Sequence, residues 1–477
     1  MVPGVRYLST RGEAPLLGFE DTVIAGLATD GGLYLPQRWP RFTPDAFQLM
    51  RELDYPALAA RIIAAFAAPA ISEAELAEIA ADAYRSFDHE DVAPLKPIAE
   101  GEWMLELFHG PTLAFKDYAL QVLGRLFEIV LGRRGTRMTI IGATSGDTGS
   151  AAIEACRDRP NIEIFMLHPK GRVSEVQRRQ MTTVASANVH NIAVEGTFDD
   201  CQALVKDMFN DAPFRERFRL GAVNSINWAR IVAQVVYYVR AALALGAPDR
   251  PVSFAVPTGN FGNVFSGYVA RCIGVPIKRL IIGSNRNDIL TRFFATGRME
   301  LGEVYPTLSP SMDIQVSSNF ERLLFELYGR DGGAVRQLMS QFREHKAFEV
   351  DPMRLRHAQA LFKAVRFDDE ETKAAIRDVF AATGTLIDPH SAIGVAACRA
   401  ARERGAGADA VPTVMLATAH AAKFPEPVAA ATGVHPALPP RLANLFELAE
   451  HYDVLPPDLP AIENYVATML AQREAIG

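Results

Sequence analysis

The sequence predicts an α/β protein whose body is a mainly parallel sheet covered by helices on both faces. Short β-branched runs at 138–143, 162–168, 252–257 and 277–283 alternate with longer helical segments, which is the order of a parallel sheet. After 138–143 and after 252–257 the chain enters a turn rich in Gly, Ser, Thr and Asn that opens a helix. Such a turn directs backbone N–H groups and the positive end of a helix dipole at one point, so we expect two anion-binding loops.

Five segments are expected along the chain. They are an N-terminal, mostly helical domain at 1–95, the α/β body at 96–285 including a smaller lobe with the first loop, a helical insertion at 286–384, a return to the body at 385–430 and a C-terminal extension at 431–477. In the first segment, alanine-rich helices near 58–66 and 73–84 are separated by Pro69. The return to the body is expected as a helix from residue 388 and a strand at 411–418.

Composition excludes several classes of protein. The 477 residues carry a net charge of −7 without long runs of one sign, so no nucleic-acid surface is indicated. The four cysteines stand alone, without the spacing of a zinc site or a disulfide framework, and no metal is expected. The N-terminus is charged where a signal peptide needs an apolar core, and no stretch has the length of a membrane helix. We expect a soluble, cytoplasmic protein.

The two loops do not match the common nucleotide-binding motifs. The first reads GATSGDTGS from residue 142 and the second PTGNFGN from residue 257. No lysine follows the glycines as in a P-loop, and neither loop has the G-x-G-x-x-G spacing with its downstream acid. Helix capping would explain either loop alone. Two such loops together with an isolated lysine favour ligand binding.

That lysine is Lys116, which lies between the tight turn HGPT and an apolar helical face. The face is formed by Ala119, Leu120, Leu123, Leu126, Phe127 and Val130. The helix's positive end and burial both favour a neutral amine, which can form an imine with an aldehyde and then move protons. A lysine that reaches the surface or pairs with Asp117 is the plain alternative. With two anion-binding loops, Lys116 suggests pyridoxal 5′-phosphate acting on a phosphorylated substrate.

Six motifs carry a resemblance to a known family. HGPTLAFKDYA, GATSGDTGSAA, VNSINWARI, PTGNFGN, SSNFERLLFELYG and ATAHAAKF resemble the threonine synthases, in the branch with an extended N-terminal domain, as do YLSTRG and ATDGGLYLP near the start. The resemblance runs from about residue 6 to about residue 430. It implies the pyridoxal-phosphate fold of type II, similar to the tryptophan synthase β subunit. It also implies conversion of O-phospho-L-homoserine and water into L-threonine and phosphate, with Lys116 as the main proton carrier.

The resemblance implies the cofactor contacts. Lys116 corresponds to the lysine that binds the cofactor as an imine, and Thr418 to the hydroxyl residue that hydrogen-bonds the pyridine nitrogen. A neutral hydroxyl at that place leaves the nitrogen unprotonated, whereas an aspartate would hold it protonated. The other implied cofactor contacts are Phe115 and the phosphate cradle of Gly259, Asn260, Phe261, Gly262 and Asn263.

The first loop then corresponds to the site for the substrate's phosphate, with neutral donors that include the backbone of Gly146 and Gly149. Asp147 either caps the following helix or turns toward the cofactor. His109 and His420 are interpreted as structural. The implied substrate contacts are Thr144, Ser145, Asp147, Thr148, Asn227, Arg230, Asn319 and Arg322.

Two alternatives stay open from the residues. The chain could be another lyase of this fold, such as a serine or threonine dehydratase or an enzyme similar to the tryptophan synthase β subunit, which needs no second phosphate site. It could also be a cofactor-binding homologue that has lost catalysis, although Lys116 and the loop residues are present. We expect a monomer or a homodimer, and closure of one lobe over the site to exclude water.

Overall fold

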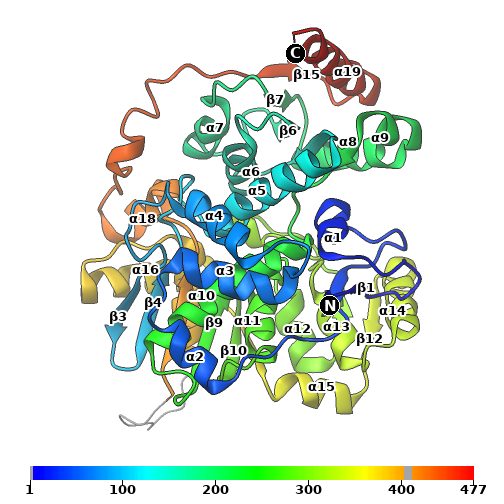
Figure 1. Cartoon of the computed structure of the whole chain (residues 1–477). Coiled ribbons are helices and arrows are strands. Elements are labelled where there is room, and N and C mark those ends of the chain that lie inside the picture. The colour runs from blue at the N-terminus through cyan, green and yellow to red at the C-terminus, as the bar shows by residue number, and fades with distance from the viewer. Residues whose placement is uncertain (1–3, 402–410, 477) are drawn as a thin grey trace. The chain divides into compact units, whose positions relative to one another are not determined.

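The computed structural model describes residues 4–401 and 411–476. They fall into two compact units (Figure 1). Unit 1 comprises Met1–Ala119 and Ser225–Ala437, and unit 2 comprises Leu120–Asn224 and Leu438–Gly477. The predicted segment 1–95 lies within unit 1, and the predicted C-terminal extension supplies the second part of unit 2.

Unit 1 is built on a six-stranded sheet in the order β13-β10-β9-β14-β4-β3, parallel except for the pair β3–β4. Its strands are β3 Leu95–Ala99, β4 Glu102–Glu106, β9 Val252–Pro257, β10 Ile277–Ser284, β13 Phe362–Arg366 and β14 Thr413–Ala417. Two small antiparallel pairs join β1 Tyr7–Ser9 with β2 Tyr34–Pro36, and β11 Arg298–Glu300 with β12 Ala347–Glu349.

Helices cover both faces of this sheet. The helices of unit 1 are α1 Phe19–Ala25, α2 Pro44–Met50, α3 Tyr55–Ala67, α4 Glu73–Tyr84, α10 Trp228–Ala244, α11 Gly262–Cys272, α12 Ile289–Thr296, α13 Phe320–Leu327, α14 Gly332–His345, α15 Pro352–Gln359, α16 Asp369–Thr383, α17 Pro389–Ala401 and α18 Pro425–Thr432, with short 3-10 turns at Pro310–Met312 and Ala421–Lys423. Phe254 of β9 meets Tyr238 of α10, with ring centroids 4.7 Å apart, on one face. Ala255 and Ile281, one position along each strand, belong to a buried cluster with residues of α16 and α17 on the other face. The alternation of side chains along each strand therefore feeds two helical layers.

Side chains cap the starts of two N-terminal helices. The side chain of Asp54 accepts a hydrogen bond from Ala57 N at the start of α3, and Ser72 and Glu75 form a capping box at the start of α4. α3 packs on α10, which gives this segment a buried partner within unit 1. The predicted helices at 58–66 and 73–84 are thus confirmed.

Unit 2 contains an all-parallel five-stranded sheet in the order β15-β7-β6-β5-β8. Its strands are β5 Met138–Ala143, β6 Ile162–Pro169, β7 Val189–Val194, β8 Leu220–Gly221 and β15 Asp453–Leu455. Its helices are α6 Asp147–Cys156, α7 Glu175–Thr182, α8 Phe198–Asn210, α9 Ala212–Phe218 and α19 Leu459–Ile476, with a 3-10 turn at Pro440–Leu442. α5, Lys116–Arg134, begins in unit 1 and continues into unit 2.

The predicted α/β fold class is confirmed, and so are the strands expected at 138–143 and 252–257. The expectation that 286–384 is nearly all helical is wrong at three strands. β13 at 362–366 pairs with β10 as the edge of the main sheet, and β11 and β12 pair with each other. The short sequence FKAVR of β13 has one buried residue and no clear alternation of buried and exposed positions, so it does not stand out from the neighbouring helices. The end of the helix expected from residue 388 lies outside the described residues.

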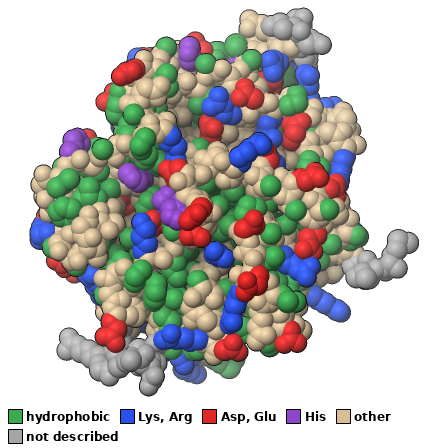
Figure 2. Space-filling view, turned by 60° about the vertical axis from the view of Figure 1, so that its left-hand side comes forward, with side chains coloured by type: hydrophobic (Ala, Val, Ile, Leu, Met, Phe, Trp, Pro, Cys, Tyr) green, Lys and Arg blue, Asp and Glu red, His purple; other side chains and the backbone are tan. Residues whose placement is uncertain are grey.

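The surface agrees with the mixed charge of the sequence. On the face shown in Figure 2, acidic and basic side chains are interspersed. Among residues 4–401 and 411–476, no helix combines the length and the apolar character that crossing a membrane requires.

Candidate active site

Lys116 is the first residue of α5 and is 9% exposed. A tight loop places it there. Asp117 accepts hydrogen bonds from Thr112 N at 2.9 Å and Thr112 Oγ1 at 2.7 Å, and the fully buried Lys423 donates from Nζ to Thr112 O at 2.7 Å. At Gly110 a Cβ would lie 2.5 Å from Asp117 Cβ, so only glycine fits this approach. The position and burial expected for Lys116 are observed.

The same loop joins Lys116 to the end of β14. Phe115 N donates to Thr418 O at 2.9 Å, and Ala114 forms an isolated bridge with Ala419. Thr418 directly follows β14 and is 5% exposed. The predicted imine-forming lysine and the predicted ring-nitrogen partner, 302 residues apart in sequence number, are therefore held on neighbouring strands of backbone.

The loop 259–263 connects β9 to α11. Its N-cap residue, Phe261, has a left-handed backbone with φ of 63° and no side-chain group that can cap the helix. A Cβ on Gly259 would lie 3.0 Å from Ser311 O and 3.3 Å from Met312 Cα, so the neighbouring backbone closes over this turn. The first turn of α11 thus offers an uncapped helix N-terminus in a glycine-lined setting.

Asn263 adds a donor to this loop. Its Oδ1 accepts hydrogen bonds from the hydroxyl groups of Tyr237 at 2.7 Å and Tyr238 at 2.9 Å. Its buried Nδ2 has no hydrogen-bond partner among the described residues. A buried amide donor left unsatisfied is costly unless a ligand takes it. The helix end, the glycines and this donor fit the phosphate of pyridoxal 5′-phosphate, and Lys116 and Thr418 in the same unit fit its aldehyde and its ring nitrogen.

Asn319 and Arg322, predicted as substrate contacts, support this loop through protein bonds. Asn319 donates from Nδ2 to Asn260 O at 3.1 Å and from its backbone N to the same oxygen at 3.1 Å. Arg322 donates to Asn319 Oδ1, to Tyr34 O and to Ile226 O, and it is fully buried. Burial lowers the pKa of Arg322 to about 9. These bonds favour a role in holding the loop over direct contact with a substrate.

Asn227 and Arg230 lie at the start of α10. Asn227 caps the helix, since its Oδ1 accepts from Ala229 N at 3.0 Å, and its Nδ2 donates to Val23 O at 2.8 Å. Arg230 is 2% exposed, and burial lowers its pKa to about 10. Asn227 therefore has a structural task, and Arg230 stays a predicted substrate contact.

In the loop 144–149 of unit 2, a side-chain hydroxyl group accepts hydrogen bonds from the loop's own backbone. Thr144 Oγ1 accepts hydrogen bonds from Gly146 N and from Gly149 N, both at 2.9 Å. These two N–H groups, expected to donate to a phosphate, are engaged within the loop. Ser145 is exposed and Thr148 half-buried, so their side chains remain the predicted donors.

Asp147 is not the helix cap. The N-cap of α6 is Gly146, and Asp147 is the first helical residue, with Oδ1 accepting from Gln177 Nε2 at 2.8 Å. Ser174 Oγ in turn donates to Gln177 Oε1 at 2.8 Å. Gln177 was not predicted from the sequence. In the structure its side chain lies where a Cβ on Gly146 would be, because that Cβ would come within 2.5 Å of Gln177 Cδ.

The two histidines interpreted as structural have structural contacts. His109 bridges Asp88 and Glu106, with both ring nitrogens 2.9 Å from a carboxylate oxygen. His420 accepts a hydrogen bond from Ala422 N at 3.1 Å. Three polar residues that the sequence interpretation passed over, Asp388, His390 and Ser391, form a buried cluster beside Thr418.

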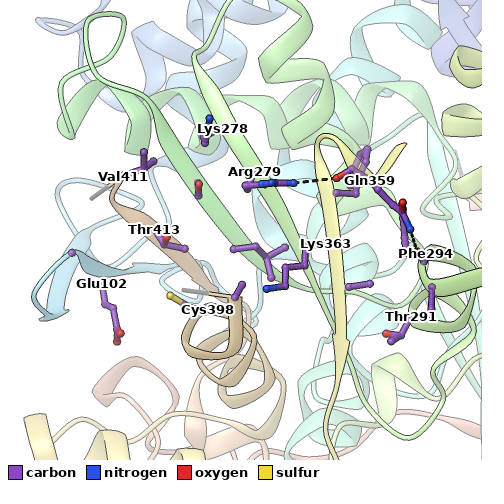
Figure 3. Close-up of a pocket in the computed structure, with 17 residues that line it drawn as sticks. Glu102, Lys278, Arg279, Thr291, Phe294, Gln359, Lys363, Cys398, Val411 and Thr413 are labelled. Atoms are coloured by element: carbon purple, nitrogen blue, oxygen red, sulfur yellow. Dashed lines mark hydrogen bonds between the residues drawn. The ribbon is translucent and has the colours of Figure 1, made fainter. Parts of the chain in front are cut away.

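A pocket of about 710 Å³ lies at the opposite end of the unit 1 sheet (Figure 3). It is lined at the amino-terminal ends of the strands, for example by Glu102 of β4, Phe362 of β13 and Thr413 of β14. Arg279 donates to Gln359 O at 3.0 Å along its rim. The predicted cofactor contacts lie at the other ends of the strands. Thr418 follows the carboxyl end of β14, the loop 259–263 follows that of β9, and Phe115, next to Lys116, bonds Thr418 O. This pocket is therefore not the predicted cofactor site.

Three family models match the chain. "Threonine synthase N terminus" matches residues 6–84, "Pyridoxal-phosphate dependent enzyme" residues 100–341 and "Threonine synthase, C-terminal" residues 391–466. A threonine synthase from Pseudomonas aeruginosa is 54% identical and aligns over 97% of this chain and 98% of its own length.

Solved structures agree. The crystal structure of a pyridoxal-phosphate-bound threonine synthase from Brucella melitensis is 52% identical, with a TM-score of 0.95 over 98% of this chain and 99% of that chain. The threonine synthase from Escherichia coli is 31% identical, with a TM-score of 0.81 over 97% and 99% of the two chains.

Proposed function

Because the chain belongs to the threonine synthase family of pyridoxal-phosphate-dependent enzymes, we propose that it converts O-phospho-L-homoserine and water into L-threonine and phosphate. One structural observation supports this proposal most directly. Within unit 1, a buried lysine, a strand-end hydroxyl and an uncapped helix start with an unsatisfied amide donor lie on adjoining elements. This is the donor set that the cofactor's aldehyde, ring nitrogen and phosphate need.

Lys116 is proposed to carry the protons of the reaction. When bound, the cofactor serves as an electron sink for negative charge next to the substrate's amino group. With cofactor and substrate bound, Lys116 Nζ would accept the proton from the α carbon and return protons later in the reaction. Its burial at the positive end of α5 favours the neutral amine that this task requires.

Thr418 and the loops are proposed to set the reaction's course. The neutral Thr418 hydroxyl leaves the ring nitrogen unprotonated, which limits how far charge is drawn away from the carbon atoms that must lose phosphate and take up water. Ser145 and Thr148 are proposed as donors to the substrate's phosphate, and Arg230 to a substrate anion. Phosphate leaves from the γ carbon, and water adds at the β carbon.

The purified holoenzyme tests this proposal. We expect equal amounts of phosphate and L-threonine from O-phospho-L-homoserine, and a visible absorbance band of the protein-bound cofactor. Lys116→Ala should lose the band and lower kcat by about 10⁴-fold, because it removes both the covalent anchor and the base. Lys363→Ala, an exposed lysine of the same unit, is the matched control and should keep both.

Other outcomes separate the alternatives. A band with release of ammonia from serine or threonine, and no phosphate from phosphohomoserine, would indicate a dehydratase. A band with no turnover of either substrate would indicate a cofactor-binding homologue without catalysis. No band at all would contradict the cofactor assignment.

The proposal includes a cytoplasmic location and a monomer or homodimer. All four cysteines are free thiols, and three are buried, which suits a reducing compartment. Fractionation of cells would test the location, and light scattering of the purified protein distinguishes the two oligomeric states.

A further inference from the structure

The start of α17 contains a buried polar cluster, which we name the α17 cluster and define as Asp388, His390 and Ser391. Asp388 is fully buried, His390 is 4% exposed and Ser391 is 1% exposed. No step of the proposed reaction uses any of them. A buried carboxylate is costly unless its lone pairs are satisfied, so the cluster needs a physical reason.

Every oxygen position of Asp388 is used. Oδ1 accepts from Ser391 N at 3.0 Å and from Ser391 Oγ. Oδ2 accepts from His390 N at 3.0 Å and from His390 Nδ1 at 2.7 Å. The two backbone bonds are those of a residue that caps a helix. Capping does not account for the two side-chain bonds, because both of those side chains reach onward to other segments.

The directions of these bonds are fixed by the outer partners. Thr418 N donates to Ser391 Oγ at 3.0 Å, and a backbone N–H can only donate, so the Ser391 hydroxyl proton points to Asp388. Ser311 N donates to His390 Nε2 at 3.2 Å, so Nε2 is unprotonated and Nδ1 carries the proton that Asp388 accepts. Two relays therefore meet at one carboxylate.

The outer ends of the relays are parts of the proposed cofactor site. One relay ends on the backbone of Thr418, whose carbonyl is held from the other side by Phe115 N, next to Lys116. The other ends on Ser311, whose carbonyl oxygen would lie 3.0 Å from a Cβ on Gly259. The α17 cluster thus touches the segments on which the ring-nitrogen partner and the phosphate loop depend.

We propose that the α17 cluster positions the cofactor: Asp388, acting through Ser391 and His390, sets the distance between Thr418 and the phosphate loop at Gly259. Its residues are positioning residues and contact no reacting atom. The inference rests on the proposed function for the identity of the cofactor and of its two contacts. The new claim is that the α17 cluster fixes the distance between those two contacts.

Ser391→Ala tests the proposal with the least damage, since Asp388 keeps its three other donors. Thr372→Val is the matched control: Thr372 is 1% exposed, and its hydroxyl donates to Asp368 O at 2.7 Å in α16 of the same unit. Ser391→Thr keeps the hydroxyl and serves as the conservative variant. The measurements are the dissociation constant of pyridoxal 5′-phosphate, the wavelength of the bound-cofactor band, kcat and KM separately, and the midpoint of thermal unfolding.

We expect Ser391→Ala to raise the cofactor dissociation constant about tenfold, to shift the band and to lower kcat more than it raises KM. Ser391→Thr should restore the wild-type band. Thr372→Val should keep the cofactor dissociation constant within twofold of the wild-type value and leave the band unshifted. This holds even if its thermal midpoint falls as far as that of Ser391→Ala.

Two results overturn the proposal. The first is a Ser391→Ala protein whose cofactor affinity and band equal those of the wild type, and the second is an equal loss of affinity in Thr372→Val. Failure of the proposed reaction has a different signature, because a wild-type protein that binds the cofactor but releases no phosphate leaves the affinity and band measurements to decide on the α17 cluster. A wild-type protein without a cofactor band overturns both.

Discussion

The loop 259–263 in unit 1 and the loop 144–149 in unit 2 both lead from a buried parallel strand into a helix, yet they use their donors in different ways. Among the described residues, Asn263 Nδ2 has no hydrogen-bond partner, and no side chain caps the start of α11. In the other loop, Thr144 Oγ1 takes the N–H groups of Gly146 and Gly149. In the first loop a buried side-chain donor has no partner among the described residues, whereas in the second loop two backbone donors are bonded to a side chain of the same loop.

This difference suggests a division of labour. A loop with unsatisfied donors pays a cost until a resident group fills it, which suits a tightly held cofactor. A loop whose donors are bonded within the loop has little free-energy cost without a ligand. That property suits a substrate that must enter and leave at each turnover. Variants that act on one loop should therefore change one binding constant and spare the other.

Among variants of these two loops, the largest effect is expected from Gly146→Ala in unit 2. Gly146 has φ of 140°, and a Cβ there would lie 2.5 Å from Gln177 Cδ, so alanine strains the backbone and displaces the side chain that holds Asp147. We expect KM for O-phospho-L-homoserine to rise by roughly 100-fold while the cofactor dissociation constant stays within twofold. Gly171→Ala is the control, because Gly171 also has positive φ but open space around it. Loss of cofactor affinity in Gly146→Ala would break the proposed division.

Asn263→Asp should act on the other constant. Aspartate keeps an acceptor for the Tyr237 and Tyr238 hydroxyl groups but replaces the Nδ2 donor with a negative charge. We expect the cofactor dissociation constant to rise about 30-fold, and the rise to be larger at low salt. KM measured at saturating cofactor should stay near the wild-type value. Titration of the apoprotein with the cofactor at two ionic strengths measures this, and an unchanged constant would remove Asn263 from the site.

Acid should loosen unit 2 through His168. This residue follows Leu167, whose carbonyl accepts from Thr144 N, and burial lowers the pKa of His168 to about 4, with Arg178 lowering it further and Glu450 opposing. The unfolded chain then binds more protons than the folded one between the ordinary pKa of about 6.5 and 4, so stability is lost as pH falls through that range.

The expected change is at most tenfold in the unfolding equilibrium constant per pH unit from this group. Hydrogen exchange of amides in β5 and β6 at pH 7 and pH 5 measures it, with amides of β9 and β14 as the internal comparison. His168→Gln should reduce the difference. Equal acid sensitivity in both sets of strands, or in the variant, would contradict the assignment.

How much the sequence foretold differs from element to element. The strand 252–257 and the helix beginning at 262 are fully specified by a run of buried β-branched and aromatic residues ending in a glycine-rich turn. The edge strand β13 was missed because its five residues carry too short a pattern to compete with the helices around it. β15, with three residues, is shorter still. Only its pairing with β7, about 260 residues earlier, identifies it as a strand.

Within the site, the sequence determined the residue types and their order: a lysine before an apolar helix, two loops rich in donors and a threonine at the end of a strand. Only the tertiary structure decided what each donor does. It turned Arg322 and Asn319 inward as supports of the loop, closed Thr144 on its own loop, and joined Asp388 to Thr418 and Ser311 through two side chains. The physical reason is that periodicity and turn chemistry are local, whereas the partner of a buried polar group is chosen by whichever distant segment the fold brings within hydrogen-bond distance.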